Sequence, residues 1–192
     1  FSATTVKISV PIYKQKTVKL VASFTNAPAG FAETPISYTL SETEVDVMGT
    51  PETIDALTEI RLAPINFYEI SDEKSSFDVA LSLPNGIRVM DNIEAVTVKI
   101  DTSDYMQRTF NITDCRAVNL EDGLSVGQIS SVRNVKVFGP KSVMRKLSAS
   151  DLYAEVDLSG RTAGQYTMSV TVKSTASDKL WQVGDYTTVV VI

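Results

Sequence analysis

Apolar and polar residues alternate along most of the chain with a period of two. Val96, Val98 and Ile100 alternate with polar neighbours, and residues 166–172 follow the same rule. This period places successive side chains on opposite faces of a strand, so it predicts strands with one buried face. Turn signals, such as Pro-Asn-Gly at 84–86, separate the runs. The pattern predicts a mainly β protein.

Two short segments depart from this alternation. Residues 50–52 (Thr-Pro-Glu) combine a helix-capping residue, a proline suited to the first turn and a first-turn acid. Ile54 and Leu57 follow at a helical spacing, and residues 139–147 repeat the arrangement. Each segment predicts a short helix of about two turns.

The sequence also repeats itself. Matching segments lie 89–93 residues apart: Thr5–Ile8 with Thr97–Ile100, Tyr13 with Tyr105, Lys16 with Arg108, Asn26–Phe31 with Asn119–Leu124, and Val45–Gly49 with Val135–Gly139. The small drift in distance indicates a tandem duplication with short insertions in loops. We therefore predict two tandem β modules, each with one short α-helix: a first repeat, residues 13–103, and a second repeat, residues 104–192. Because 97–100 close the first repeat, we expect residues 1–12 to contain the closing strand of a truncated upstream repeat.

The alternation also predicts the core. Twelve apolar residues at matching positions are expected to be buried: Val47, Ile54, Leu57, Val79, Leu81, Val98, Val137, Met144, Leu147, Met168, Val170 and Val190.

Composition excludes several kinds of chemistry. The 192 residues include no histidine and one cysteine, Cys115. This removes Ser-His-Asp and Cys-His triads, an internal disulfide and a thiolate metal cluster. The net charge of -5 argues against a nucleic-acid partner, and no acidic run has the spacing of an EF-hand loop. We expect no catalytic residues, no metal and no cofactor.

Three aromatic residues are candidates for contacts. Trp181 lies near the last hairpin, where an exposed tryptophan would be a hot spot for a partner; packing over the end of the sheet is the alternative. Tyr13 and Tyr105 occupy equivalent junction positions at the starts of the two repeats, and the junction between the repeats, 101–106, lacks glycine and proline. Six residues span at most about 20 Å, so we expect these tyrosines to pack between neighbouring repeats.

The second repeat resembles YbbR domains. The segments that carry the resemblance are Val135–Leu147, the lead-in Asn119–Leu124, and Val156–Gly160 followed by Gly164–Thr167. The resemblance extends over nearly all of residues 16–192 and is strongest in the second repeat. The first repeat departs from it at Thr50, which lies between Gly49 and Pro51, and at Ile65–Tyr68.

The resemblance implies a function. YbbR proteins carry an N-terminal membrane helix and several such domains outside the cytoplasmic membrane, and the best-understood members regulate the membrane diadenylate cyclase that makes cyclic di-AMP. It therefore implies a non-catalytic, extracytoplasmic regulatory or scaffolding module that acts through protein contacts and reaches the cell membrane only through an anchor outside this chain.

Other functions stay open. An extracellular module that binds cell-wall glycan or a surface protein is the main alternative, and exposed aromatics along one sheet face would favour it. A carboxylate-dependent hydrolase is less favoured, because no acid pair lies at equivalent positions in both repeats. RNA binding is opposed by the net charge.

Overall fold

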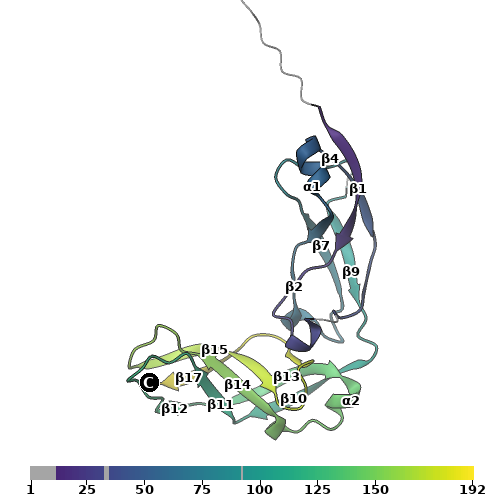
Figure 1. The fold of residues 1–192 in the computed structure, drawn as a ribbon. Coiled ribbons are helices and arrows are strands. Elements are labelled where there is room, and N and C mark those ends of the chain that lie inside the picture. The colour runs from purple at the N-terminus through teal and green to yellow at the C-terminus, as the bar shows by residue number, and fades with distance from the viewer. Residues whose placement is uncertain (1–11, 33–34, 92) are drawn as a thin grey trace, which may run out of the picture. The chain divides into compact units, whose positions relative to one another are not determined.

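A computed structural model describes residues 12–32, 35–91 and 93–192 (Figure 1). The strand expected within residues 1–12 lies, apart from Ile12, outside the described residues. The protein is mainly β, and the described part of each repeat has one short α-helix, α1 (Pro51–Ala56) and α2 (Lys141–Met144). The predicted fold class is confirmed.

The strands of each repeat follow one another in a matching series. The first repeat has β1 (Lys14–Val21), β2 (Phe24–Thr25), β3 (Tyr38–Leu40), β4 (Glu44–Gly49), β5 (Glu59–Leu62), β6 (Ile65–Asn66), β7 (Ser76–Ser82), β8 (Arg88–Val89) and β9 (Ala95–Ile100). The second has β10 (Tyr105–Ile112), β11 (Cys115–Val118), β12 (Gln128–Ile129), β13 (Val132–Pro140), β14 (Leu152–Asp157), β15 (Gln165–Ser174), β16 (Trp181–Gln182) and β17 (Tyr186–Val191). Three single-turn 3-10 helices, η1 (Ala29–Phe31), η2 (Phe67–Glu69) and η3 (Ala149–Asp151), complete the described elements.

The same strand order occurs twice. The first repeat forms one sheet, β3-β9-β7-β5-β1-β4-β8, and the second forms β12-β17-β15-β14-β11 and β10-β13-β16. The first sheet is continuous because β1 pairs in parallel with β5. In the second repeat the parallel partner of β14 is β11 instead of β10, so the sheet divides there. The helices also match, since α1 packs on β1 and β4 and α2 packs on β10 and β13.

The chain forms two compact units whose limits differ from those of the repeats. Unit 2 contains residues 24–39, 65–77 and 99–192, and unit 1 contains the remaining residues. Two loop segments of the first repeat therefore belong to the same compact unit as the second repeat. The candidate functional site lies within unit 2.

The core follows the predicted alternation with three exceptions. Nine of the expected residues are buried: Val47, Ile54, Val79, Val98, Val137, Met144, Leu147, Val170 and Val190. Leu57, Leu81 and Met168 are only half-buried, contrary to the prediction. For Leu57 the reason is local, because the backbone is already extended there, at φ -81° and ψ 117°. Leu147 instead continues the helical turn by donating its N–H to Val143 O at 3.1 Å.

Candidate functional site

An aromatic cluster surrounds Trp181 in unit 2. Trp181 lies on β16 and is only 2% exposed. The ring centres of Phe31, Phe67, Tyr105 and Phe138 lie 5.1–5.8 Å from that of Trp181. The indole N–H donates to Ile70 O at 3.0 Å. Trp181 is therefore an interior residue with a satisfied polar group, and its side chain is not an exposed contact for a partner.

Backbone hydrogen bonds hold the first-repeat loops against the segments on either side of β16. Gly30 N–H donates to Asp178 O at 3.0 Å, and Gly184 N–H donates to Tyr68 O at 2.8 Å. The approach at Gly30 is close: a Cβ there would lie 2.6 Å from Asp178 Oδ1. The loops are thus attached by main-chain bonds as well as by the aromatic rings.

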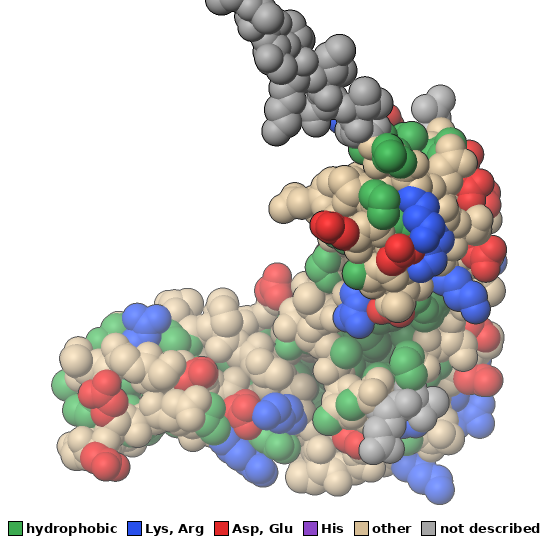
Figure 2. All heavy atoms as spheres, turned by 45° about the horizontal axis from the view of Figure 1, so that its top comes forward, with side chains coloured by type: hydrophobic (Ala, Val, Ile, Leu, Met, Phe, Trp, Pro, Cys, Tyr) green, Lys and Arg blue, Asp and Glu red, His purple; other side chains and the backbone are tan. Residues whose placement is uncertain are grey.

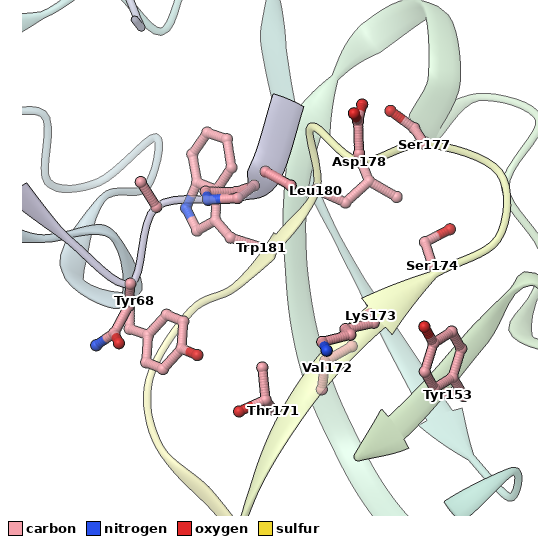
Figure 3. A pocket seen from close by; sticks show the side chains of 14 residues that line it. Tyr68, Tyr153, Thr171, Val172, Lys173, Ser174, Ser177, Asp178, Leu180 and Trp181 are labelled. Atoms are coloured by element: carbon pink, nitrogen blue, oxygen red, sulfur yellow. The ribbon is translucent and has the colours of Figure 1, made fainter. Parts of the chain in front are cut away.

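A cavity of about 550 Å³ opens beside this cluster (Figure 3). Its walls come from the loop 26–29, from η2, from β14 and β15, and from the segment between β15 and β16. In Figure 3, Tyr68 and Tyr153 lie on opposite sides of Thr171 and Lys173. Both tyrosines are half-buried, so each keeps part of its ring available.

Two ion pairs lie at or near the cavity. Lys173 Nζ lies 2.6 Å from Glu155 Oε1, and this hydrogen bond raises the pKa of Lys173. The Arg116 guanidinium lies 3.8 Å from the ring centre of Tyr153. Arg116 also binds Asp114 at 2.6 Å, and this bond lowers the pKa of the Asp114 carboxyl. The site offers aromatic rings, hydroxyls and charged side chains, which suit binding.

The wider surface has mixed charge. On the face drawn in Figure 2, acidic and basic side chains are interspersed, with small groups of hydrophobic side chains between them. Such a face produces no strong field of one sign. Among the described residues, no group of three or more His, Cys, Asp or Glu side chains is placed to hold a metal ion. Neither described helix is long and apolar enough to cross a membrane.

The two predicted contact tyrosines lie in different units. Tyr105 is half-buried and stacks on Phe138, with ring centres 6.0 Å apart and planes 8° apart. Burial raises the pKa of Tyr105. Tyr13, in unit 1, is 50% exposed. Both described ring partners of Tyr105 belong to the second repeat, and packing of these tyrosines between repeats stays a prediction.

Cys115 is half-buried on β11 and its thiol donates to Ser130 O at 3.4 Å. Burial raises the pKa of the Cys115 thiol. A raised pKa lowers the thiolate fraction, which is the reactive form.

Sequence reasoning missed Phe31 and Phe67 of the aromatic cluster, and Tyr68 and Tyr153 of the cavity lining. A signal for two of them was present. Phe67 and Tyr68 stand in the segment where the first repeat departs from the YbbR pattern, opposite Leu158 and Ser159 of the second repeat. That departure introduces one ring of the cluster and one wall of the cavity.

Comparison with protein families finds a match in the second repeat. The model of the YbbR-like protein family matches residues 116–192. The chain contains a YbbR-like domain. The matched YbbR-like domain runs from β11 to the end of the chain, so it includes Tyr153, Lys173 and Trp181. The resemblance drawn from the motifs of the second repeat is confirmed.

Two solved structures are similar to this YbbR-like domain protein. The crystal structure of a YbbR-like protein from Streptococcus pneumoniae is 15% identical, with a TM-score of 0.36, and the match covers 98% of each chain. A solution structure from Streptococcus thermophilus is 23% identical, with a TM-score of 0.35, over 49% of this chain and 89% of the other. The comparison with curated proteins found no match.

Proposed function

We propose that this YbbR-like domain protein is a non-catalytic module that acts by binding another protein. The cavity beside Trp181 carries the proposal. Its lining combines Tyr68 and Tyr153 with hydrogen-bonding groups, and the Arg116 guanidinium stacks on the Tyr153 ring. Tyrosine and arginine are enriched where proteins meet, because they present large contact areas together with polar groups.

The family resemblance supports a partner and a place. The partner is a membrane diadenylate cyclase, and contact with the module changes the rate of cyclic di-AMP synthesis. The module acts at the extracytoplasmic face of the cell membrane and is held there by an anchor outside this chain.

Binding to the cyclase tests the proposal directly. The full chain is added to the membrane-embedded cyclase, and binding and cyclic di-AMP production are measured together. We expect Tyr153→Ala to weaken binding about tenfold, which corresponds to about 1.4 kcal/mol at a contact residue. Tyr166→Ala is the control, because it removes a half-buried tyrosine from β15, the strand beside β14, at a position outside the cavity. Binding that neither variant changes would place the contact elsewhere.

Glycan binding is the second candidate. The same two tyrosine rings line one cavity with the polar side chains of Asn26, Thr171 and Asp178, and sugars bind by stacking on rings while donating and accepting hydrogen bonds. Titration of the chain with soluble peptidoglycan fragments, followed by NMR, would separate the two functions. Shifts confined to the cavity residues, together with an unchanged cyclase rate, would favour the glycan.

A further inference from the structure

A surface that is covered in the second repeat has an open counterpart in the first. In β13 and β16, Phe138 pairs with Trp181, and in β4 and β8, Met48 pairs with Arg88. The neighbouring glycines match as well. A Cβ at Gly139 would meet Leu180, and a Cβ at Gly49 would meet Ile87. Ile87 and Arg88 therefore occupy the places of Leu180 and Trp181.

The loops that cover Trp181 also have counterparts. Asn26 and Asn119 both have positive φ, 53° and 56°. Asn26 donates to the Asn66 side chain at 3.1 Å, and Asn119 forms the matching bond with Asp157. The acceptors match again, since Asn66 accepts from Tyr68 N–H and Asp157 accepts from Ser159 N–H. The loops 119–124 and 157–159 are thus equivalent to 26–31 and 66–68.

Unit 1 has a groove at the equivalent place. A cavity of about 520 Å³ lies beside β8 and is lined in part by Leu83, Ile87, Arg88 and Asp91. Leu83 is 38% exposed there, whereas its counterpart Val172 is buried. In unit 2 the corresponding wall carries the loop 26–29 and Tyr68.

We propose that the groove of unit 1 binds the loops 119–124 and 157–159 of a second copy of this chain, head to tail. The contact that the equivalent loops make inside unit 2 shows how the proposed contact forms. Two of its hydrogen bonds join main-chain atoms, at Gly30 with Asp178 and at Tyr68 with Gly184. Main-chain bonds depend little on side-chain identity, so the equivalent atoms of two copies can form the same bonds. Gly123 N–H of one copy can donate to Asn85 O of the other, and Asp91 N–H of that other copy can donate to Ser159 O of the first.

Charge at paired positions supports a second copy as the occupant. In unit 2, Pro28, Ala29 and Trp181 line one cavity and are all uncharged. Their counterparts are Glu121, Asp122 and Arg88, which carry opposite charges on the loop and in the groove. Uncharged residues lie at these positions in unit 2, whereas the proposed contact places acidic residues of the loop opposite a basic residue of the groove.

The association is weak, because Asp91 and Glu94 also line the groove and repel the acidic loop. The apolar contact is smaller too, since Leu124 and Leu158 replace Phe31 and Phe67. We expect a dissociation constant on the order of 0.1–1 mM. The two contact surfaces differ, so the contact does not close on itself, and larger assemblies form as the concentration rises.

Sedimentation velocity on the full chain, from about 10 µM to about 1 mM, tests this inference. We expect the weight-average sedimentation coefficient to rise with concentration. Arg88→Glu should weaken association about tenfold, and adding Glu121→Arg with Asp122→Arg should restore it. Asp91→Asn with Glu94→Gln should strengthen it, while Arg133→Glu, an equal charge reversal at an exposed site away from both surfaces, should leave it unchanged.

Two results would overturn the inference. One is a single monomeric species at every concentration, for the parent chain and for Asp91→Asn with Glu94→Gln. The other is an association that Arg88→Glu leaves as strong as before. Circular dichroism of each variant checks that the fold is kept, and none of these measurements depends on the cyclase.

Discussion

The two repeats share a framework but differ at the surface next to β8 and β16. In the first repeat Lys16 Nζ donates to Leu57 O at 2.6 Å, and in the second Arg108 donates to Leu147 O at 2.8 Å. Both basic side chains therefore bind carbonyls at the end of the helical segment of their own repeat. At the neighbouring surface, Met48 and Arg88 of the first repeat are replaced by Phe138 and Trp181 of the second.

The difference shows which positions hold the fold and which have been adapted. The glycines, the asparagines and the basic residue on the first strand, which binds carbonyls at the end of the helical segment, serve the same backbone geometry in both repeats, so they match. The ring surface serves a contact made in unit 2 alone, with Phe31 and Phe67. Matched substitutions in the two repeats can therefore separate the common framework from the contact specific to unit 2.

Loss of Trp181 should have the largest effect. Trp181→Ala removes four ring contacts and leaves Ile70 O without its donor, so we expect a loss of about 3–5 kcal/mol in the free energy of unfolding. The matched change Arg88→Ala alters an exposed side chain and should cost at most about 0.5 kcal/mol. Urea unfolding followed by circular dichroism measures both. Similar costs for the two variants would show that the cluster is not what distinguishes the repeats.

The helix leucines should follow. Leu147 is buried and Leu57 is half-buried, so Leu147→Ala is expected to cost about 2–5 kcal/mol and Leu57→Ala about 1 kcal/mol. The same unfolding experiment measures the free energies. A loss below about 1 kcal/mol at Leu147 would contradict the burial of this side chain.

The basic residues that bind the helix-end carbonyls, Lys16 and Arg108, should contribute less to stability. Arg108→Met leaves Met144 O and Leu147 O without a donor, and Lys16→Met does the same to Leu57 O. Both side chains are half-buried, so water partly replaces the lost bonds and we expect about 1 kcal/mol for each. Arg108→Lys is the control, because lysine makes the equivalent bond in the first repeat. If Arg108→Lys lost as much stability as Arg108→Met, the two bases would not be interchangeable in this role.

The smallest effect concerns pH. Hydrogen bonds from Ser159 N–H and Asn119 hold the pKa of Asp157 below its ordinary value of 3.8. A carboxyl with a lower pKa in the folded protein stabilises the fold above its unfolded pKa, and this contribution is lost as the pH falls through the folded pKa. Asp157→Asn should therefore reduce the loss of stability below about pH 4.

The matched variant for this experiment is Asn66→Asp, at the equivalent place in the first repeat. It should add a pH dependence of the same sign, because the new carboxylate accepts from Tyr68 N–H. Thermal unfolding at a series of pH values measures both changes. An unchanged acid response in Asp157→Asn would mean that the pKa of Asp157 matters little for stability.

The fold could be predicted further than the site. Period-two alternation, turn residues and helix starts are local signals, and they indicated the strands and both helices. The helix at α1 shows the limit of such signals. Its spacing of three placed Leu57 on the buried face, but the backbone becomes extended at that residue. The end of a helix depends on tertiary contacts as well as on residue type.

The β class, the duplication and the YbbR-like framework can be inferred from the amino-acid sequence alone, because each of them repeats or alternates along the chain. The division into units and the site required the tertiary structure. Ile70 and Trp181 are 111 positions apart and join through one hydrogen bond. The local sequence around Phe31, Phe67 and Tyr68 does not specify the distant segment around β16 on which these residues pack. Burial of rings is non-directional and gains free energy wherever apolar surfaces meet, so which rings meet is decided by how the whole chain folds.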